Sequence, residues 1–141
     1  MAHFKWSGAH SVYLPEIDAE HRALFHLGEE LQKGIAAGTD LAHLRPVLVN
    51  LLESAEAHFK HEERIMKAAH YSAFAWHKKQ HDAVRWRVKR LVRRIDAGQP
   101  AAAGELLEFL DSWLKTHTRV SDRMMGAYLR NLLRFNTRLA S

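Results

Sequence analysis

Apolar and small residues recur along the first half of the chain at alternating spacings of three and four, the period of an amphipathic α-helix. Two such stripes are present, through Ile17, Leu24, Gly28, Leu31 and Ile35, and through Leu44, Leu48, Leu51, Ala55, Ile65 and Ala69, with polar residues at positions 21, 58 and 62 of the same repeat. The stripes predict one helix over about 18–37 and a longer one over about 41–69. Gly38-Thr39-Asp40 separates the two helices.

The second half of the chain continues the same period. A third helix is predicted from about residue 72 to just before Ala97-Gly98-Gln99-Pro100, where glycine and proline both discourage continuation. A fourth begins after Pro100 and runs to about Arg134. Strand-like alternation is absent, and short connections favour antiparallel neighbours. We therefore predict an all-α protein: an up-down-up-down four-helix bundle (17–135) with an extended N-terminal arm (1–16) and a C-terminal tail (136–141).

A histidine or a carboxylate interrupts every stripe at a position that should face the core. The interrupting residues are His21, His58, Glu62, His77, His81 and His117. Burying each polar group without compensation costs a few kcal/mol, and more for an ionised carboxylate. Because the stripes contain no matching set of lysines or arginines, we expect bound cations to compensate these groups.

The spacing within the second and third helices suits chelation. HFKHE (58–62) and HKKQH (77–81) each place two donor side chains four residues apart, on neighbouring turns of one helical face. One such pair is common by chance, whereas two pairs at core positions are not. His61 lies off this face and is predicted to be a surface residue. The other histidines, His3, His10, His26, His43 and His70, have no partner at chelating spacing.

The fourth helix contains a change of phase in HTRVSD (117–122). The apolar phase before His117 does not continue after it, because Met125, Leu129 and Leu132 follow a stripe that starts at Asp122. One extra residue accommodated as a π-bulge would turn Asp122 inward, and such bulges are frequent at functional sites. Asp122 is therefore the seventh predicted ligand.

The absence of cysteine excludes thiolate sites, so any metal must use histidine and carboxylate. Five imidazoles and two carboxylates suit iron, copper, zinc or manganese, and they exceed what one ion needs. A dinuclear site bridged by both carboxylates follows. Completed by a bridging oxo or hydroxo group, it leaves one open coordination position.

The net charge of +5 and the basic stretch RWRVKRLVRR (85–94) raise the question of nucleic-acid binding. Most of these cations lie outside the apolar stripe of their helix, as on a solvated face, and no reader motif accompanies them. We therefore expect no nucleic-acid partner. Neither a signal peptide nor a membrane span is evident. A cytoplasmic protein is predicted; its oligomeric state is left open, with a monomer favoured.

The complete set, His21, His58-x3-Glu62, His77-x3-His81 and His117-x4-Asp122, resembles the hemerythrin family, in particular its bacterial single-domain members. The resemblance extends to IDAEH (17–21), HFKHEERIM (58–66), HY (70–71) and WLKTH (113–117). It implies two non-haem iron ions bridged by Glu62, Asp122 and an oxo or hydroxo group. His77, His81 and His117 would hold one iron, and His21 and His58 the other, where O2 would bind.

The resemblance also implies an O2 pocket. Leu114 matches the residue that caps it, and Trp113, Phe25 and Phe59 are expected wall residues. Thr118 departs from the family, which commonly has an aliphatic residue there; its hydroxyl would lie near the pocket.

Reversible, non-catalytic O2 binding for storage, transport or delivery is the function that the resemblance favours. A di-iron peroxidase, a nitric-oxide or peroxide scavenger, and a metal buffer are the alternatives. An unidentified reductase or O2-consuming enzyme is a candidate partner.

Overall fold

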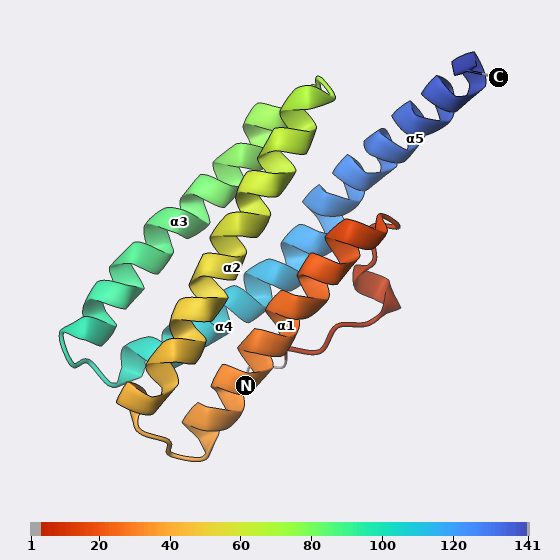
Figure 1. Cartoon of the computed structure of the whole chain (residues 1–141). Helices are drawn as coiled ribbons and strands as arrows, with labels where there is room; N and C mark the ends of the chain where they lie inside the picture. Colours follow the sequence, from red (N-terminus) through yellow and green to blue (C-terminus); the bar gives the residue numbers. More distant parts are fainter. Residues whose placement is uncertain (1–3, 141) are drawn as a thin grey trace.

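The computed structural model describes residues 4–140, with side chains to residue 136, and these residues form helices and loops without a strand. The long helices are α1 (Pro15–Ala36), α2 (Leu41–Ala68), α3 (Phe74–Asp96), α4 (Ala101–His117) and α5 (Arg123–Ala140). A π-helical turn, η2 (Thr118–Asp122), joins α4 to α5 so that they form one rod (Figure 1). The predicted four-helix bundle is thereby confirmed.

Three helix ends show how local chemistry sets the boundaries. Pro15 occupies the first turn of α1, where its missing N–H costs nothing, so α1 starts earlier than the predicted residue 18. Asp40 caps α2 by accepting from the Ala42 amide. The prediction that the last helix ends near Arg134 is wrong, because neither glycine nor proline follows Gly126 and α5 continues to Ala140. The predicted tail thus begins inside α5.

Two apolar clusters form the core. The larger contains Leu24, Phe25, Leu51, Phe59, Val84, Leu91, Leu106, Leu110 and Leu114 among others. The smaller contains Met66, Tyr71, Met125 and Leu129. Each buried side chain of this size stabilises the fold by about 1.5–3 kcal/mol. Along the helices, the inward histidines and carboxylates lie between the two clusters, so packing on both sides holds their backbones in place.

The N-terminal arm is packed against α1 and α5 and includes a short 3-10 turn, η1 (Gly8–His10) (Figure 1). Phe4 is buried against Gly28, where a Cβ would come within 2.4 Å of the Phe4 ring. Val12 is buried against Gly126, where a Cβ would come within 2.7 Å of the Val12 carbonyl oxygen. Glycine at these two positions lets the arm approach both helices.

Within the described part of the chain, none of the helices combines the length and apolar character that crossing a membrane would require.

Candidate metal centre

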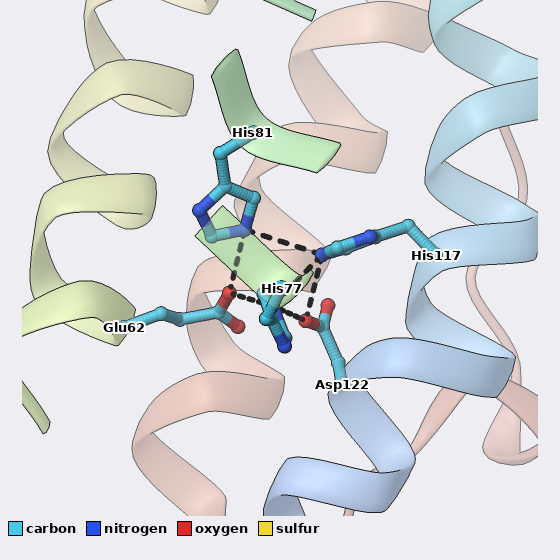
Figure 2. A group of neighbouring side chains, drawn as sticks. All are labelled: Glu62, His77, His81, His117 and Asp122. Carbon is cyan, nitrogen blue, oxygen red and sulfur yellow. Dashed lines mark hydrogen bonds and ion pairs between the residues drawn. The ribbon is translucent and has the colours of Figure 1, made fainter. Parts of the chain in front are cut away.

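All seven predicted ligand residues meet in the centre of the bundle. Their donor atoms form two groups, within each of which all atoms lie within 4.8 Å of one another. One group consists of Glu62, His77, His81, His117 and Asp122, which Figure 2 shows converging from α2, α3 and the α4–η2 rod. The other consists of His21, His58, Glu62 and Asp122. The groups therefore share both carboxylates and divide the imidazoles three to two.

The π-helical turn η2 brings Asp122 into this centre. It spans Thr118–Asp122, directly after His117, so the predicted bulge is confirmed. The wider turn accommodates one additional residue and lets His117 and Asp122, five residues apart, face the same point. The Asp122 Oδ1 atom lies 3.0 Å from the Nε2 atom of His117 and 3.0 Å from that of His77.

The Nε2 atoms of the histidines point at one another. The His117 Nε2 atom is 3.0 Å from that of His77 and 3.2 Å from that of His81. On the other side, the Nε2 atoms of His21 and His58 are 3.0 Å apart. These imidazoles are almost entirely buried, so water does not separate their nitrogens.

In three of the histidines, the Nδ1 atom, which faces away from the centre, has a hydrogen-bond acceptor. This determines whether the Nε2 atom, which faces the centre, carries a proton. The Nδ1 atom of His58 lies 2.6 Å from Glu20 Oε1, that of His81 2.8 Å from Glu63 Oε2, and that of His117 2.8 Å from Gln80 Oε1. An Nδ1–H that donates to these oxygens leaves a lone pair on Nε2 of the neutral ring. Lone pairs directed at one another across about 3 Å repel unless a cation lies between them.

The carboxylates show the same need for a cation. Glu62 Oε2 is 3.2 Å from the His58 Nε2 atom and Asp122 Oδ1 is 3.0 Å from those of His77 and His117, but neither oxygen accepts a well-aligned hydrogen bond among the described residues. Buried carboxylate oxygens that face only ring nitrogens are costly. Five nitrogen donors, two carboxylates and a ring of outer acceptors match the ligation of a borderline divalent metal, and the residues fit such a site.

The pKa values describe the charges in the metal-free centre. Burial lowers the pKa of His58, but the Glu62 and Glu20 carboxylates outweigh burial and raise it to about 10. At His77, burial would again lower the pKa, but the Asp122 and Glu62 carboxylates outweigh burial and raise it to about 9. Burial would raise the pKa of Glu62, but the surrounding imidazoles hold it well below its usual range. A bound metal would take over this neutralisation and displace the imidazole protons.

Four of the five predicted O2-pocket residues lie beside His81 or His117. Phe59 stacks on His81 with ring centroids 4.2 Å apart, and Trp113 stacks on His117 at the same separation. Leu114 is buried one turn before His117, and Thr118 is buried beside it. The Thr118 hydroxyl donates to the Leu114 carbonyl oxygen.

Phe25 lies one turn beyond His21 on α1 and contacts His10 of the arm, with ring centroids 5.1 Å apart. Whether these five residues together form an O2 pocket stays a prediction.

The acceptors Glu20, Glu63 and Gln80 were missed by sequence reasoning. Each directly precedes or follows a predicted ligand in the sequence, which was the available signal. His61 is half-buried and its Nδ1 atom lies 2.6 Å from Glu20 Oε2, so Glu20 accepts from two histidines at once. His61 belongs to neither group of donors.

Comparison with known proteins agrees with this geometry. The family model of the hemerythrin HHE cation binding domain matches residues 13–129. The chain belongs to the hemerythrin family. The hemerythrin chain is 32% identical to the bacteriohemerythrin of Clostridium acetobutylicum over 124 residues, which cover 85% of this chain and 96% of the relative. It is 27% identical to the bacteriohemerythrin of Methylococcus capsulatus, with coverage of 92% and 98%.

The similarity extends to a myohemerythrin. The chain is 26% identical to the myohemerythrin of Theromyzon tessulatum, over 84% of this chain and 88% of that protein. The matched segment, residues 13–129, contains all seven residues of the two donor groups and leaves out η1 of the arm.

Replacing Gln80 with leucine is expected to weaken metal binding by about 10- to 100-fold, the usual effect of losing an outer hydrogen-bond partner. Gln80 Oε1 accepts from both the His117 Nδ1–H and the Ser121 hydroxyl, so its loss frees the His117 ring to rotate. Competition with a chelator of known affinity would measure the change. Gln99→Leu, at an exposed position beside Arg94, is the matched control and should bind metal like the wild type. Equal affinities for both variants would contradict the assigned role.

Proposed function

We propose that this hemerythrin binds O2 reversibly at a pair of non-haem iron ions. His77, His81 and His117 would hold one ion, His21 and His58 the other, and Glu62 and Asp122 would contribute to both, together with an oxo or hydroxo group. The observation that supports this most directly is the unequal division of imidazoles between two donor groups that share both carboxylates. The ion with two histidines is one ligand short, which leaves room for a small exogenous molecule.

A pair of ferrous ions in this site would supply the electrons needed to bind O2 and would recover them on its release. The protein supplies orientation and exclusion of water. Glu20, Glu63 and Gln80 hold three imidazoles in one tautomer with Nε2 facing inward. Phe59 stacks on His81 and Trp113 on His117, and the larger apolar cluster covers one side of the centre with side chains that are neither acids nor bases.

The position of Thr118 favours O2 binding over peroxidase or scavenging chemistry. An enzyme of that class needs a proton donor close to the bound oxygen species. The Thr118 hydroxyl is the sequence feature that suggested one, but its hydrogen is directed to the Leu114 carbonyl within its own helix. This hydroxyl is therefore already engaged and does not favour catalysis.

Mixing the anaerobic ferrous protein with O2 tests the proposed function. An absorption spectrum that appears with O2, persists, and disappears under vacuum is the expected result. Rapid oxidation of the iron with turnover of added peroxide would show instead that the site is catalytic. Absence of any spectral response from a protein that carries two iron ions would leave metal buffering as the function.

Replacing Leu114 with alanine is expected to make the oxygenated protein oxidise several times faster, because the truncation opens space for water one turn from His117. The decay of the oxygenated spectrum at constant temperature measures this rate. Leu110→Ala removes a similarly buried side chain one turn nearer the start of α4, farther from His117, and should cost similar stability, about 2–5 kcal/mol. If both variants oxidise at the same rate, Leu114 has no special role in covering the site.

A further inference from the structure

His10 is a buried histidine that the metal centre does not use. Only 2% of its surface is exposed, and its Nδ1 atom has no hydrogen-bond partner among residues 4–140. Its ring packs against Phe25, with centroids 5.1 Å apart and a tilt of 35°. A buried ring nitrogen without a partner is costly, and the cost rises steeply if the ring becomes charged.

After burial, the groups that lower the pKa of His10 most are all basic. They are Arg119 from η2, Lys115 from α4, His21 from α1 and Arg123 from α5. Burial first, and these cations second, lower the pKa of His10. Metal ions at the centre would add positive charge and act in the same direction.

The two acids near the arm are already engaged. The Asp18 carboxylate accepts from the Ser11 hydroxyl at 2.6 Å and from the Val12 amide at 2.9 Å. Asp122 lies at 3.0 Å from ring nitrogens of the metal centre. Neither carboxylate forms an ion pair with His10.

The turn that carries His10 lies between two buried apolar residues of the arm and is itself held by polar contacts. Phe4 on one side and Val12 on the other are fully buried against helices, whereas Ser7, Gly8 and Ala9 are exposed. Two backbone hydrogen bonds close the turn, from the His10 amide to the Ser7 carbonyl oxygen and from the Ser11 amide to the Gly8 carbonyl oxygen.

Side chains outside the turn also hold it: Arg123 donates to the Ala9 carbonyl oxygen at 2.6 Å and to the Ser11 carbonyl oxygen at 3.3 Å, and the Ser11 hydroxyl donates to Asp18. Opening of the segment Ser7–Ser11 breaks these polar contacts and leaves the apolar contacts of Phe4 and Val12 at either end in place.

We propose that the segment Ser7–Ser11 is a flap that opens in acid, and that protonation of His10 is the event that opens it. A charged His10 cannot remain among Lys115, Arg119 and Arg123 without a counter-ion, so it moves to water and takes the turn with it. Opening uncovers Phe25, one turn from His21, and the adjacent turn η2. The flap thus controls access of water to the side of the centre that carries two histidines.

The direction of the pH dependence follows from linkage. The open flap carries a His10 with a pKa near 6.5, and the closed flap carries one with a lower pKa, so the open state binds more protons. The closed state is fully favoured above about pH 6.5 and loses its advantage as pH falls below that value. The opening constant then rises by up to about tenfold per pH unit until the pKa of the closed state is reached.

Amide hydrogen exchange on the full-length, iron-loaded protein tests the flap. Protection of the His10 and Ser11 amides, corrected for intrinsic exchange rates, should fall by up to about fivefold between pH 6.5 and 5.5, because only half of His10 in the open flap is protonated at the higher pH. Amides of α2 around His58 are the internal reference, because loss of metal would lower their protection as well. His10→Phe keeps a ring of similar size but cannot take up a proton, so its flap should stay protected at both pH values.

His43→Gln is the matched control for removing a histidine. His43 is exposed on α2, and its variant should retain the acid response of the wild type. The proposal is overturned if His10→Phe opens in acid as the wild type does, or if wild-type protection does not change with pH. Should His10→Phe fail to fold, His10→Leu and the wild-type measurement still decide the question. Because none of these readouts involves O2, the flap and the proposed O2 binding can fail separately.

Discussion

Replacing Glu62 with alanine is expected to reduce the iron content from two ions per chain to one or none. Glu62 is completely buried and, like Asp122, belongs to both donor groups, so its loss removes an oxygen donor from each group at once. It also leaves His58 and His77 without the carboxylate that balances their charge. Quantifying iron per chain after anaerobic loading with excess ferrous salt and desalting would measure the effect.

Two further variants show whether this loss is specific. Glu62→Gln preserves the shape of the side chain and one oxygen. If this variant folds but binds fewer than two ions, the loss of iron is due to the missing carboxylate rather than to the missing volume. Glu53→Ala, on the exposed side of the same helix, removes a glutamate of equal charge and should keep both ions. Two ions bound by Glu62→Ala would contradict the assignment of Glu62 as a shared ligand.

Removing the metal is expected to lower the midpoint of thermal unfolding by about 12 °C or more. The metal-free centre retains imidazole nitrogens that face one another at 3.0 Å and buried carboxylate oxygens without a well-aligned hydrogen bond, as described for His117 and Asp122. A ligand present at about a thousand times its Kd stabilises a fold by about 4 kcal/mol, and each kcal/mol shifts the midpoint of a domain of this size by about 3 °C. Calorimetry before and after treatment with a strong chelator would measure the difference.

The Glu62→Ala variant serves as the reference for chelation. Because it should contain at most one ion, the chelator should lower its unfolding temperature less than that of the wild type, which separates loss of metal from direct effects of the reagent. A wild-type protein that unfolds at the same temperature with and without its metal would show that the polar centre needs no ion. The proposed O2 binding would then lose its physical basis.

The sequence by itself determined the helices and most of the centre, because both depend on spacing along a single chain. The repeat of three and four residues positions Leu24, Leu51 and Leu106 in the core, and the four-residue spacing of His77 and His81 places both rings on one face. The π-helical turn could also be predicted, because the phase of the apolar stripe changes between His117 and Asp122. Local periodicity is a property that each helix carries independently of its neighbours.

Only the tertiary structure decided how the helices complete one another. Glu20 accepts from His58 across 38 positions in the sequence, and Gln80 accepts from His117 across 37, and no periodicity links such pairs. The burial of His10 against Phe25 could not be predicted from the sequence either, because the arm has no repeat that would indicate which face of the bundle it covers. Contacts between segments depend on how helices rotate and pack against each other, which is settled only when the whole bundle forms.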